Sequence, residues 1–352
     1  MLADLTVRGY EVNLWNHRPE RIQPVVENRR VDIVDSMGEF SVQLRHETRV
    51  STNLREVVEG CSILFSTVPA FAQRNVTTQL SQHLTDGQLL VFLPGSCGSL
   101  EATQVLRGIG VKKDIILAEA LSLPQSGRVI GPGKIRAAST LIRERRTREG
   151  AQRFAAFPAK RTEEALEMLE GIYPFRKSKN VLEVGLLNVN FLIHPAPYVL
   201  NIATIERTNG DISLLNEGIS PSVLKIMDKM DAEKLELCRK LRIEPVSCED
   251  LYREFGHGPV YRLPKNPMGF RDRIPDIRTS RYITEDVPYG IVMWSSFGDM
   301  VGVDTPVTDA VIRLASVIQD VDYMKEGRTT DKLGVSGMAV DELETYLYEG
   351  AG

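Results

Sequence analysis

The sequence has no long apolar run, few cysteines and little net charge, and each absence excludes a class of protein. No apolar run approaches the roughly 20 residues needed to span a bilayer, and the first residues lack the basic and apolar regions of a signal peptide. A net charge of −4 provides no general attraction to nucleic acid or to an anionic membrane. We therefore expect a cytoplasmic protein that binds small molecules and contacts neither nucleic acid nor membrane.

The 4 cysteines fall at no spacing typical of a metal site. In a chain of this size without a secretory signal, they are expected to be free thiols rather than disulfides. We therefore expect no bound metal. The cysteines are Cys61, Cys97, Cys238 and Cys248.

The chain of 352 residues is too long for one ordinary hydrophobic core, so two domains are expected. A content of 42% hydrophobic and 26% charged residues is typical of a soluble globular protein. A polar connector from Tyr173 to Asn180 marks the change from one pattern to the next. We place the domains at residues 1–176 and 177–352.

The first domain alternates short apolar strands with helices. This pattern predicts an α/β fold, a Rossmann-type doubly wound parallel sheet with helices on both faces. We predict helices at 1–8, 54–60, 73–83 and 100–108, and strands at 10–15, 49–52, 62–68, 88–93 and 115–119.

Ligands of such sheets bind at the carboxyl ends of the strands, so three loops are candidates for cofactor contact. The alternative is that each is an ordinary connection between a strand and a helix. The candidate residues are Asn16, His17, Arg18, Thr67, Val68, Pro69, Pro94 and Gly95.

A dinucleotide-binding fold ordinarily opens with a strand and a Gly-x-Gly-x-x-Gly turn that holds the pyrophosphate, and this motif is absent from the sequence. The first residues instead read as the helix that should follow such a turn, with Gly9 at its end. We therefore expect the central strand of the sheet to be missing. A start codon assigned too far downstream or a truncated, impaired protein would both explain this, and we favour the first.

The end of the second strand bears on the choice of cofactor. An acidic residue there would bind the ribose 2′-hydroxyl of NAD, whereas an arginine accommodates the 2′-phosphate of NADP. The chain has Asn16, His17 and Arg18 at this place, which favours NADP or tolerance of both NADP and NAD. Arg18 could instead stack on adenine or point into solvent.

The second domain shows a long apolar helical pattern from Val181 to about Arg207 and further helical periodicity at 220–241. The apolar helices between Leu214 and Leu241 leave room for a homodimer contact. Asn190 and His194 interrupt the first pattern four residues apart and would share a helix face. A lone histidine on a helix is more often structural, but here prolines at 195 and 197 bend or interrupt the helix and would lift His194 into a cleft.

A second cluster of polar residues lies between 278 and 290, beside proline and glycine. We read Arg281, Glu285 and Asp286 as a site built on a loop rather than a core element. The alternative is a surface ion pair between Arg281 and Asp286, which would contribute little.

The pattern Asn190-x-x-x-His194-Pro-Ala-Pro, followed by Arg281-Tyr-x-x-Glu285-Asp286-Val-Pro-x-Gly, resembles the opine dehydrogenase family over nearly the whole chain. The resemblance implies reductive condensation of an α-keto acid with an amino acid, or the reverse oxidation, with NAD or NADP as cofactor. It also implies that His194 and Asp286 form a proton-relay pair and that Arg281 binds a substrate carboxylate. Asn190 would orient the substrate or the ring.

These roles are chemically reasonable, because a histidine titrates near neutrality and a carboxylate fixes its tautomer.

Two other functions stay open. A related reductase of a 2-keto or 2-hydroxy acid, such as a ketopantoate reductase or glycerol phosphate dehydrogenase, relies on a lysine in its second domain, and 181–205 contains none. A non-catalytic nucleotide-binding regulator would have no physical need for both His194 and Asp286.

Overall fold

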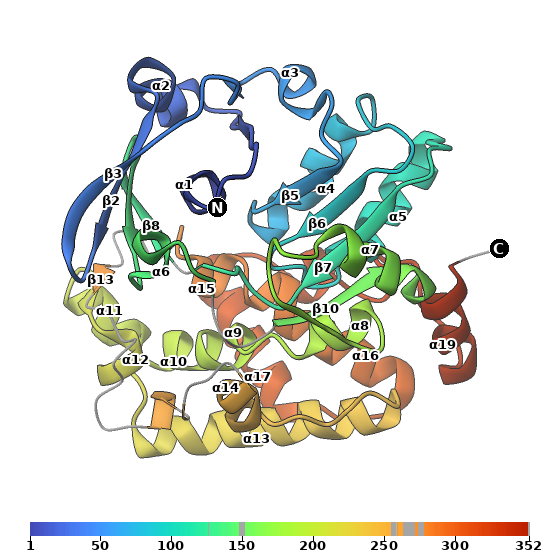
Figure 1. The fold of residues 1–352 in the computed structure, drawn as a ribbon. Coiled ribbons are helices and arrows are strands. Elements are labelled where there is room, and N and C mark those ends of the chain that lie inside the picture. The colour runs from blue at the N-terminus through green and yellow to red at the C-terminus, as the bar shows by residue number, and fades with distance from the viewer. Residues whose placement is uncertain are drawn as a thin grey trace.

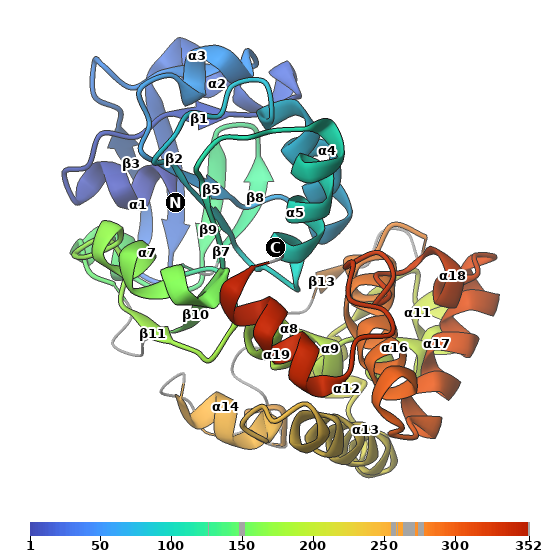
Figure 2. The ribbon, with the colours of Figure 1, turned by 90° about the vertical axis from the view of Figure 1, so that its right-hand side faces the viewer.

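The computed structural model describes residues 1–125, 127–147, 152–254, 258, 260–262, 272–273 and 278–350. The chain forms an α/β part from its first half and a helical part from its second half, and Figures 1 and 2 show the two packed against each other. The predicted fold class, a nucleotide-binding α/β domain followed by a mainly helical domain, is confirmed.

The main sheet has five strands in the order β11-β10-β7-β6-β5. Strands β5, β6 and β7 are parallel to one another, as predicted. Strand β10 is antiparallel to β7, and β11 is parallel to β10, so the last two strands run in the opposite direction. The strands are β5 (Ile63–Ser66), β6 (Leu89–Phe92), β7 (Ile116–Ala120), β10 (Gln152–Phe157) and β11 (Phe175–Lys177).

Both faces of this sheet are covered, because side chains of β6 alternate between two cores. Leu89 and Val91 pack on one side with Ala165 and Leu169, which lie in and just after helix α7. The intervening residues of β6 pack on the other side with helices α4 and α5. The helices of this part are α1 (Leu2–Val7), α2 (Pro19–Asn28), α3 (Leu54–Val58), α4 (Ala70–Leu80), α5 (Gly98–Ile109), α6 (Leu141–Glu144), a 3-10 turn (Ala159–Arg161) and α7 (Thr162–Met168).

Strands β1 (Leu14–Trp15) and β4 (Val50–Ser51) form a separate parallel pair. Among the described residues, no strand is hydrogen-bonded both to this pair and to β5. In the part of the chain that the structure describes, the β1-β4 pair and the five-stranded sheet are therefore separate sheets. Strand β1 is shorter than the predicted 10–15. The N–H groups of Leu14 and of Asn16, the residue after the strand, donate to the carbonyls of Arg49 and Ser51.

A second sheet, in the order β3-β2-β9-β8, was not predicted. Strands β2 and β3 form an antiparallel hairpin, and β2 also pairs in parallel with β9, about a hundred residues later. Val31 and Ile33 alternate with polar residues and are buried. This alternation is typical of a strand, but it does not indicate that β9 is the neighbouring strand. The strands are β2 (Arg30–Asp35), β3 (Gly38–Gln43), β8 (Gly127–Gly131) and β9 (Lys134–Ala137).

The apolar stretch from Val181 to Arg207 is four short helices rather than one long helix. Proline has no N–H to donate, so Pro195 and Pro197 break the ladder of helical hydrogen bonds, and Pro195 takes the first position of a new helix. The four are α8 (Val181–Leu186), α9 (Asn190–Ile193), α10 (Pro195–Leu200) and α11 (Ile202–Arg207).

Helix α13 (Pro221–Lys240), predicted from its periodicity, is the longest element of the helical part, and the Ser220 hydroxyl caps its start. The other elements are β12 (Asp211–Ile212), α12 (Leu214–Glu217), α14 (Cys248–Glu254), a 3-10 turn (Val260–Arg262), β13 (Asp272–Arg273), α15 (Arg281–Thr284), a π-helical turn η3 (Val287–Ile291), α16 (Val292–Val301), α17 (Pro306–Gln319), α18 (Tyr323–Glu326) and α19 (Val340–Glu349).

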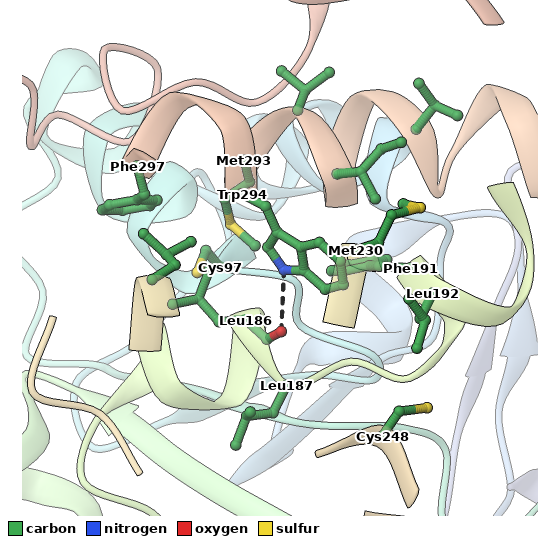
Figure 3. Packing of buried hydrophobic residues seen from close by; sticks show 14 of the residues in the cluster. Cys97, Leu186, Leu187, Phe191, Leu192, Met230, Cys248, Met293, Trp294 and Phe297 are labelled. Atoms are coloured by element: carbon green, nitrogen blue, oxygen red, sulfur yellow. Dashed lines mark hydrogen bonds between the residues drawn. The ribbon is translucent and has the colours of Figure 1, made fainter. Parts of the chain in front are cut away.

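Trp294 on α16 lies at the centre of the helical core, and its indole N–H donates to the carbonyl of Leu186 at 3.1 Å (Figure 3). Cys97, from the α/β part, lies in the same core. A side chain on Gly185 would come within 2.3 Å of the Cys97 sulfur, so the two parts pack closely at this point.

A buried cation also joins the two parts. Arg153 on β10 donates to Glu183 at 2.7 Å, to Glu244 at 2.9 Å and to Glu254 at 2.7 Å. Since a buried charge needs compensation by partners, these three carboxylates of the helical part fix the orientation of the sheet on the helices.

All four cysteines are free thiols, three of them buried. Across the described part of the chain, no helix is long and apolar enough to cross a membrane. The same residues contain no cluster of three or more His, Cys, Asp or Glu side chains placed to hold a metal ion.

Candidate active site

His194 lies at the break between α9 and α10, and Asp286 lies at the break between α15 and η3. The Nδ1 atom of His194 is 2.8 Å from Oδ2 of Asp286. The two side chains are 14% and 11% exposed, so the contact is largely shielded from water. The two residues that the sequence paired are therefore in direct contact.

The segment 281–290 is helical rather than a loop, which corrects the expectation from sequence. Pro288 and Gly290 suggested a loop, but they fall in the π-helical turn, where Gly290 is needed because a side chain there would lie 2.3 Å from the ring of Phe191. Glu285 and Asp286 are buried, 5% and 8% exposed. A rigid helical frame therefore positions the carboxylate beside His194.

Arg281 pairs with Glu285, rather than with Asp286 as the surface alternative supposed. The Arg281 side chain is 58% exposed and its Nε donates to Oε2 of Glu285. The other oxygen of Glu285 accepts the backbone N–H of Ala70 at 2.8 Å. Because Ala70 directly follows the predicted cofactor loop at Pro69, Glu285 links the two halves of the site.

Tyr282 packs on the ring of His194, with the ring centroids 4.1 Å apart and the planes tilted by 35°. It also meets Tyr198 edge to face at 6.2 Å. The sequence motif contained Tyr282 but gave it no role. An aromatic neighbour restricts the rotation of the imidazole, so Tyr282 helps to fix the His194 ring.

Asn190 begins α9, one turn before His194, and its carbonyl accepts the His194 N–H at 3.1 Å. Its own N–H is held by the Asn188 side chain at 3.1 Å. Asn190 and His194 are therefore joined by a backbone hydrogen bond across one helical turn. Asn190 is half-buried.

Asn16, His17 and Arg18 follow β1 at its carboxyl end. The Asn16 side chain accepts the Arg18 N–H at 2.9 Å, and the Arg18 Nε donates to the His17 ring at 3.2 Å. His17 and Arg18 are exposed. A cation and hydrogen-bonding groups at this strand end suit the adenosine side of a dinucleotide.

Thr67, Val68 and Pro69 follow β5, and Pro94 and Gly95 follow β6, so the two loops share the carboxyl edge of the sheet. The Gln73 amide donates to the carbonyls of Pro94 and Gly95 at 3.0 and 3.3 Å, which ties α4 to the second loop. The first loop is shorter than predicted, because α4 begins at Ala70 rather than at Gln73.

Glu119, at the end of β7, lies beneath this second loop and is fully buried. The Ser99 hydroxyl donates to it at 2.9 Å. A side chain on Gly95 would meet the Glu119 carboxyl at 1.8 Å, so glycine is required there. Burial raises the pKa of Glu119 to about 7, although the Ser99 hydroxyl and the backbone N–H groups of Cys97 and Gly98 favour the ionised form.

Arg328 was missed by sequence reasoning, since an isolated arginine between two short helices carries no motif. It is fully buried and donates to the Ser96 carbonyl at 2.6 Å and to the Gln73 side chain at 3.0 Å. It also pairs with Glu101 and lies 4.9 Å from the ring of Tyr289. Arg328 thus fixes both predicted cofactor loops against the helical part.

Comparison with known proteins agrees with this arrangement. Residues 177–319 match the alpha-helical domain of NAD/NADP octopine/nopaline dehydrogenase. Residues 2–116 match the N-terminus of NAD-dependent glycerol-3-phosphate dehydrogenase. The chain is 30% identical to the opine dehydrogenase of Arthrobacter sp. (strain 1C) over 96% of its own length and 92% of that relative.

Two solved structures have the same fold at 17% identity, each covering 100% of this chain and 95% of the other. An octopine dehydrogenase in complex with NADH and agmatine has a TM-score of 0.76. An octopine dehydrogenase with NADH and pyruvate has a TM-score of 0.72. On the strength of its identity to the Arthrobacter enzyme over nearly its whole length, the chain belongs to the opine dehydrogenase family and is an NAD-dependent oxidoreductase.

Proposed function

We propose that the protein catalyses the reductive condensation of an α-keto acid with the amino group of an amino acid, and the reverse oxidation. The observation that carries this proposal is the 2.8 Å contact between His194 and Asp286, one helical turn from the exposed Arg281. An acid–base pair next to a cation able to bind a carboxylate is what condensation of two carboxylate-bearing substrates requires.

His194 is proposed as the proton carrier. Its Nδ1 atom is held by Asp286, so proton exchange with substrate uses Nε2. The histidine gives a proton to the carbonyl oxygen as water leaves during imine formation, and takes one back when the imine is hydrolysed in the reverse direction. Asp286 fixes the tautomer and stabilises the imidazolium.

Arg281 is proposed to bind a substrate carboxylate. Its Nε is held by Glu285, while more than half of the side chain is exposed and able to present its terminal nitrogens to a ligand. A guanidinium binds a carboxylate through two parallel hydrogen bonds, which fixes orientation as well as position. Asn190 is proposed to orient the substrate or the His194 ring from the preceding turn.

The cofactor is proposed to lie along the carboxyl edge of β1, β5 and β6, where the bound dinucleotide supplies the hydride that reduces the imine. Thr67, Val68, Pro69, Pro94 and Gly95 would contact it through the two loops, while Asn16 and His17 would contact its adenosine. We propose that the exposed Arg18 favours the 2′-phosphate of NADP, with NAD also accepted. His17, Arg18 and Thr67 are exposed polar residues at the ends of β1 and β5, which suits a nucleotide.

The match of residues 2–116 to a glycerol-3-phosphate dehydrogenase N-terminus keeps a second candidate, a reductase of a simple 2-keto or 2-hydroxy acid. A substrate panel separates the two. We would follow oxidation of NADPH and NADH with pyruvate and other keto acids, with and without each amino acid. Oxidation that requires both substrates supports the proposal, whereas oxidation with a keto acid alone would replace it by the second candidate.

Three further expectations concern the domain boundary, the cellular setting and the oligomeric state. The domain boundary is placed between residues 176 and 177, within β11 at the edge of the main sheet and shortly before α8 begins. A cytoplasmic setting would suit the free thiols. A homodimer stays a prediction; Met227, Met230 and Leu237, apolar residues of α13, are buried in the chain's own core.

A further inference from the structure

Glu285 connects two segments that lie 215 residues apart. One carboxylate oxygen accepts the N–H of Ala70 at 2.8 Å, and the other accepts the Nε of Arg281. The Glu285 side chain is 7% exposed, so its carboxylate is shielded from water, while Arg281 is 58% exposed. A shielded carboxylate with both oxygens in use holds its two donors at a fixed separation.

The contact with Ala70 has a specific physical cause. Ala70 is the first residue of α4, and the first N–H groups of a helix have no partner within the helix. Pro69, which precedes it, has no hydroxyl or carboxyl to cap them. Glu285 supplies a negative charge to the positive end of the α4 dipole from the helical part of the chain.

The next residue in the chain is Asp286, which holds His194. Any movement of Glu285 therefore moves Asp286 through the intervening peptide bond. On the other side, Ala70 directly follows the Thr67–Pro69 loop proposed to contact the cofactor. Ala70 is also held through its carbonyl, which accepts from Arg328 at 3.4 Å.

We propose that Glu285 is a positioning residue that sets the proton-carrying pair and Arg281 in register with the cofactor loop. Its hydrogen bond with Ala70 fixes the distance between the His194–Asp286 pair and the cofactor loop. Its hydrogen bond with Arg281 fixes the orientation of the guanidinium. Glu285 acts through these neighbours and does not itself react. The inference rests on the proposed function.

Two substitutions test the two ends of this link separately. In Glu285→Gln the amide has a single oxygen, which the buried Ala70 N–H retains because the exposed Arg281 can turn to solvent instead. We expect the KM for one of the two substrates, the keto acid or the amino acid, to rise about tenfold while kcat stays within about twofold. Glu206→Gln, which neutralises an exposed carboxylate on α11, is the control.

In Ala70→Pro the donor N–H is removed and the ring occupies the place of the Glu285 oxygen. Proline is tolerated at the first position of a helix, and Pro69, at φ −55° and ψ 154°, has the extended conformation required before it. We expect kcat to fall about tenfold or more and the isotope effect with deuterated NADH or NADPH to increase, since hydride transfer becomes slower. Val340→Pro, at the first position of α19, is the matched control.

A purely structural role for Glu285 predicts lower melting temperatures with unchanged KM values for the keto acid and the amino acid and an unchanged isotope effect, and that result would overturn the inference. Wild-type kinetics in both variants would overturn it too. The proposed function is tested independently by His194→Ala. If that variant is inactive while Glu285→Gln and Ala70→Pro behave as wild type, only the present inference fails.

Discussion

His194 and Asp286 are 92 residues apart in sequence and 2.8 Å apart in the structure. Each lies where one helical segment ends and another begins, His194 before Pro195 and Asp286 before the π-helical turn. The backbone of both residues is nevertheless held: the His194 carbonyl accepts the N–H of Tyr198 at 3.0 Å, and the Asp286 N–H donates to the Arg281 carbonyl at 3.1 Å. The fold therefore presents the acid–base pair on a rigid frame without placing it on a flexible loop.

Replacement of Asp286 by asparagine tests the role of the carboxylate. Asparagine keeps the shape but can donate its amide hydrogen to His194 and so stabilise the wrong tautomer. We expect kcat to fall by about three to four orders of magnitude. Steady-state kinetics would measure this, and binding of the reduced cofactor should be unchanged. A fall in kcat of less than about tenfold would remove Asp286 from the mechanism.

Arg281→Lys keeps the positive charge but cannot form the bidentate pair of hydrogen bonds with a carboxylate. We expect the KM for the keto acid or amino acid to rise about tenfold, and about a hundredfold in Arg281→Met. The KM for the cofactor should stay the same in both variants. If the cofactor KM rises instead, Arg281 binds a phosphate of the dinucleotide and the assignment to a substrate carboxylate is wrong.

Arg18→Ala tests the cofactor preference. Removal of an arginine from the 2′-phosphate should weaken NADPH binding about tenfold while the affinity for NADH changes by less than about twofold. Trp15, whose ring lies 6.2 Å from that of His17, provides a fluorescent probe at this strand end. An equal loss for both cofactors would show that Arg18 contacts a part that they share.

Glu119 makes stability depend on pH. Its pKa is raised from 4.5 to about 7 by burial, so between these values the folded protein binds more protons than the unfolded chain. The free energy of unfolding should therefore decrease as pH rises from 4.5 to about 7, by an amount on the order of 3 kcal/mol from this group. Glutamine cannot ionise, yet it still accepts from Ser99.

Urea denaturation of wild type and Glu119→Gln across this pH range would measure the effect. We expect the variant to lose less stability than wild type as pH rises, with Glu206→Gln as a control that follows wild type. Parallel curves for wild type and Glu119→Gln would show that Glu119 has the same proton affinity in the folded and unfolded states.

Local patterning was sufficient to predict much of this fold. The alternation of apolar strands and helices located β5, β6 and β7, and the periodicity after Ser220 located α13. The second sheet was missed because β2 pairs with β9, which lies about a hundred residues later, and pairing over such a separation leaves no local signal. Proline at 195 predicted an interruption, but four separate helices follow from tertiary packing.

The candidate site was predicted in part for the same reason. His194, Asp286 and Arg281 lie in two compact motifs, and the structure brings His194 and Asp286 into contact. Arg328 and the contact from Ala70 to Glu285 were beyond sequence reasoning, because a backbone N–H carries no residue signature. Proline and glycine at 288 and 290 wrongly suggested a loop. Both fit a π-helical turn here, because Pro288 lies near its start and Gly290 leaves room for the ring of Phe191.

The central claim is that His194 carries the proton in an NAD(P)H-dependent condensation. The most direct test is the rate of cofactor oxidation by His194→Ala with saturating keto acid and amino acid, together with its affinity for the cofactor. The account predicts a loss of about a hundredfold or more in turnover, with cofactor affinity unchanged. Turnover equal to that of the wild-type protein would contradict it.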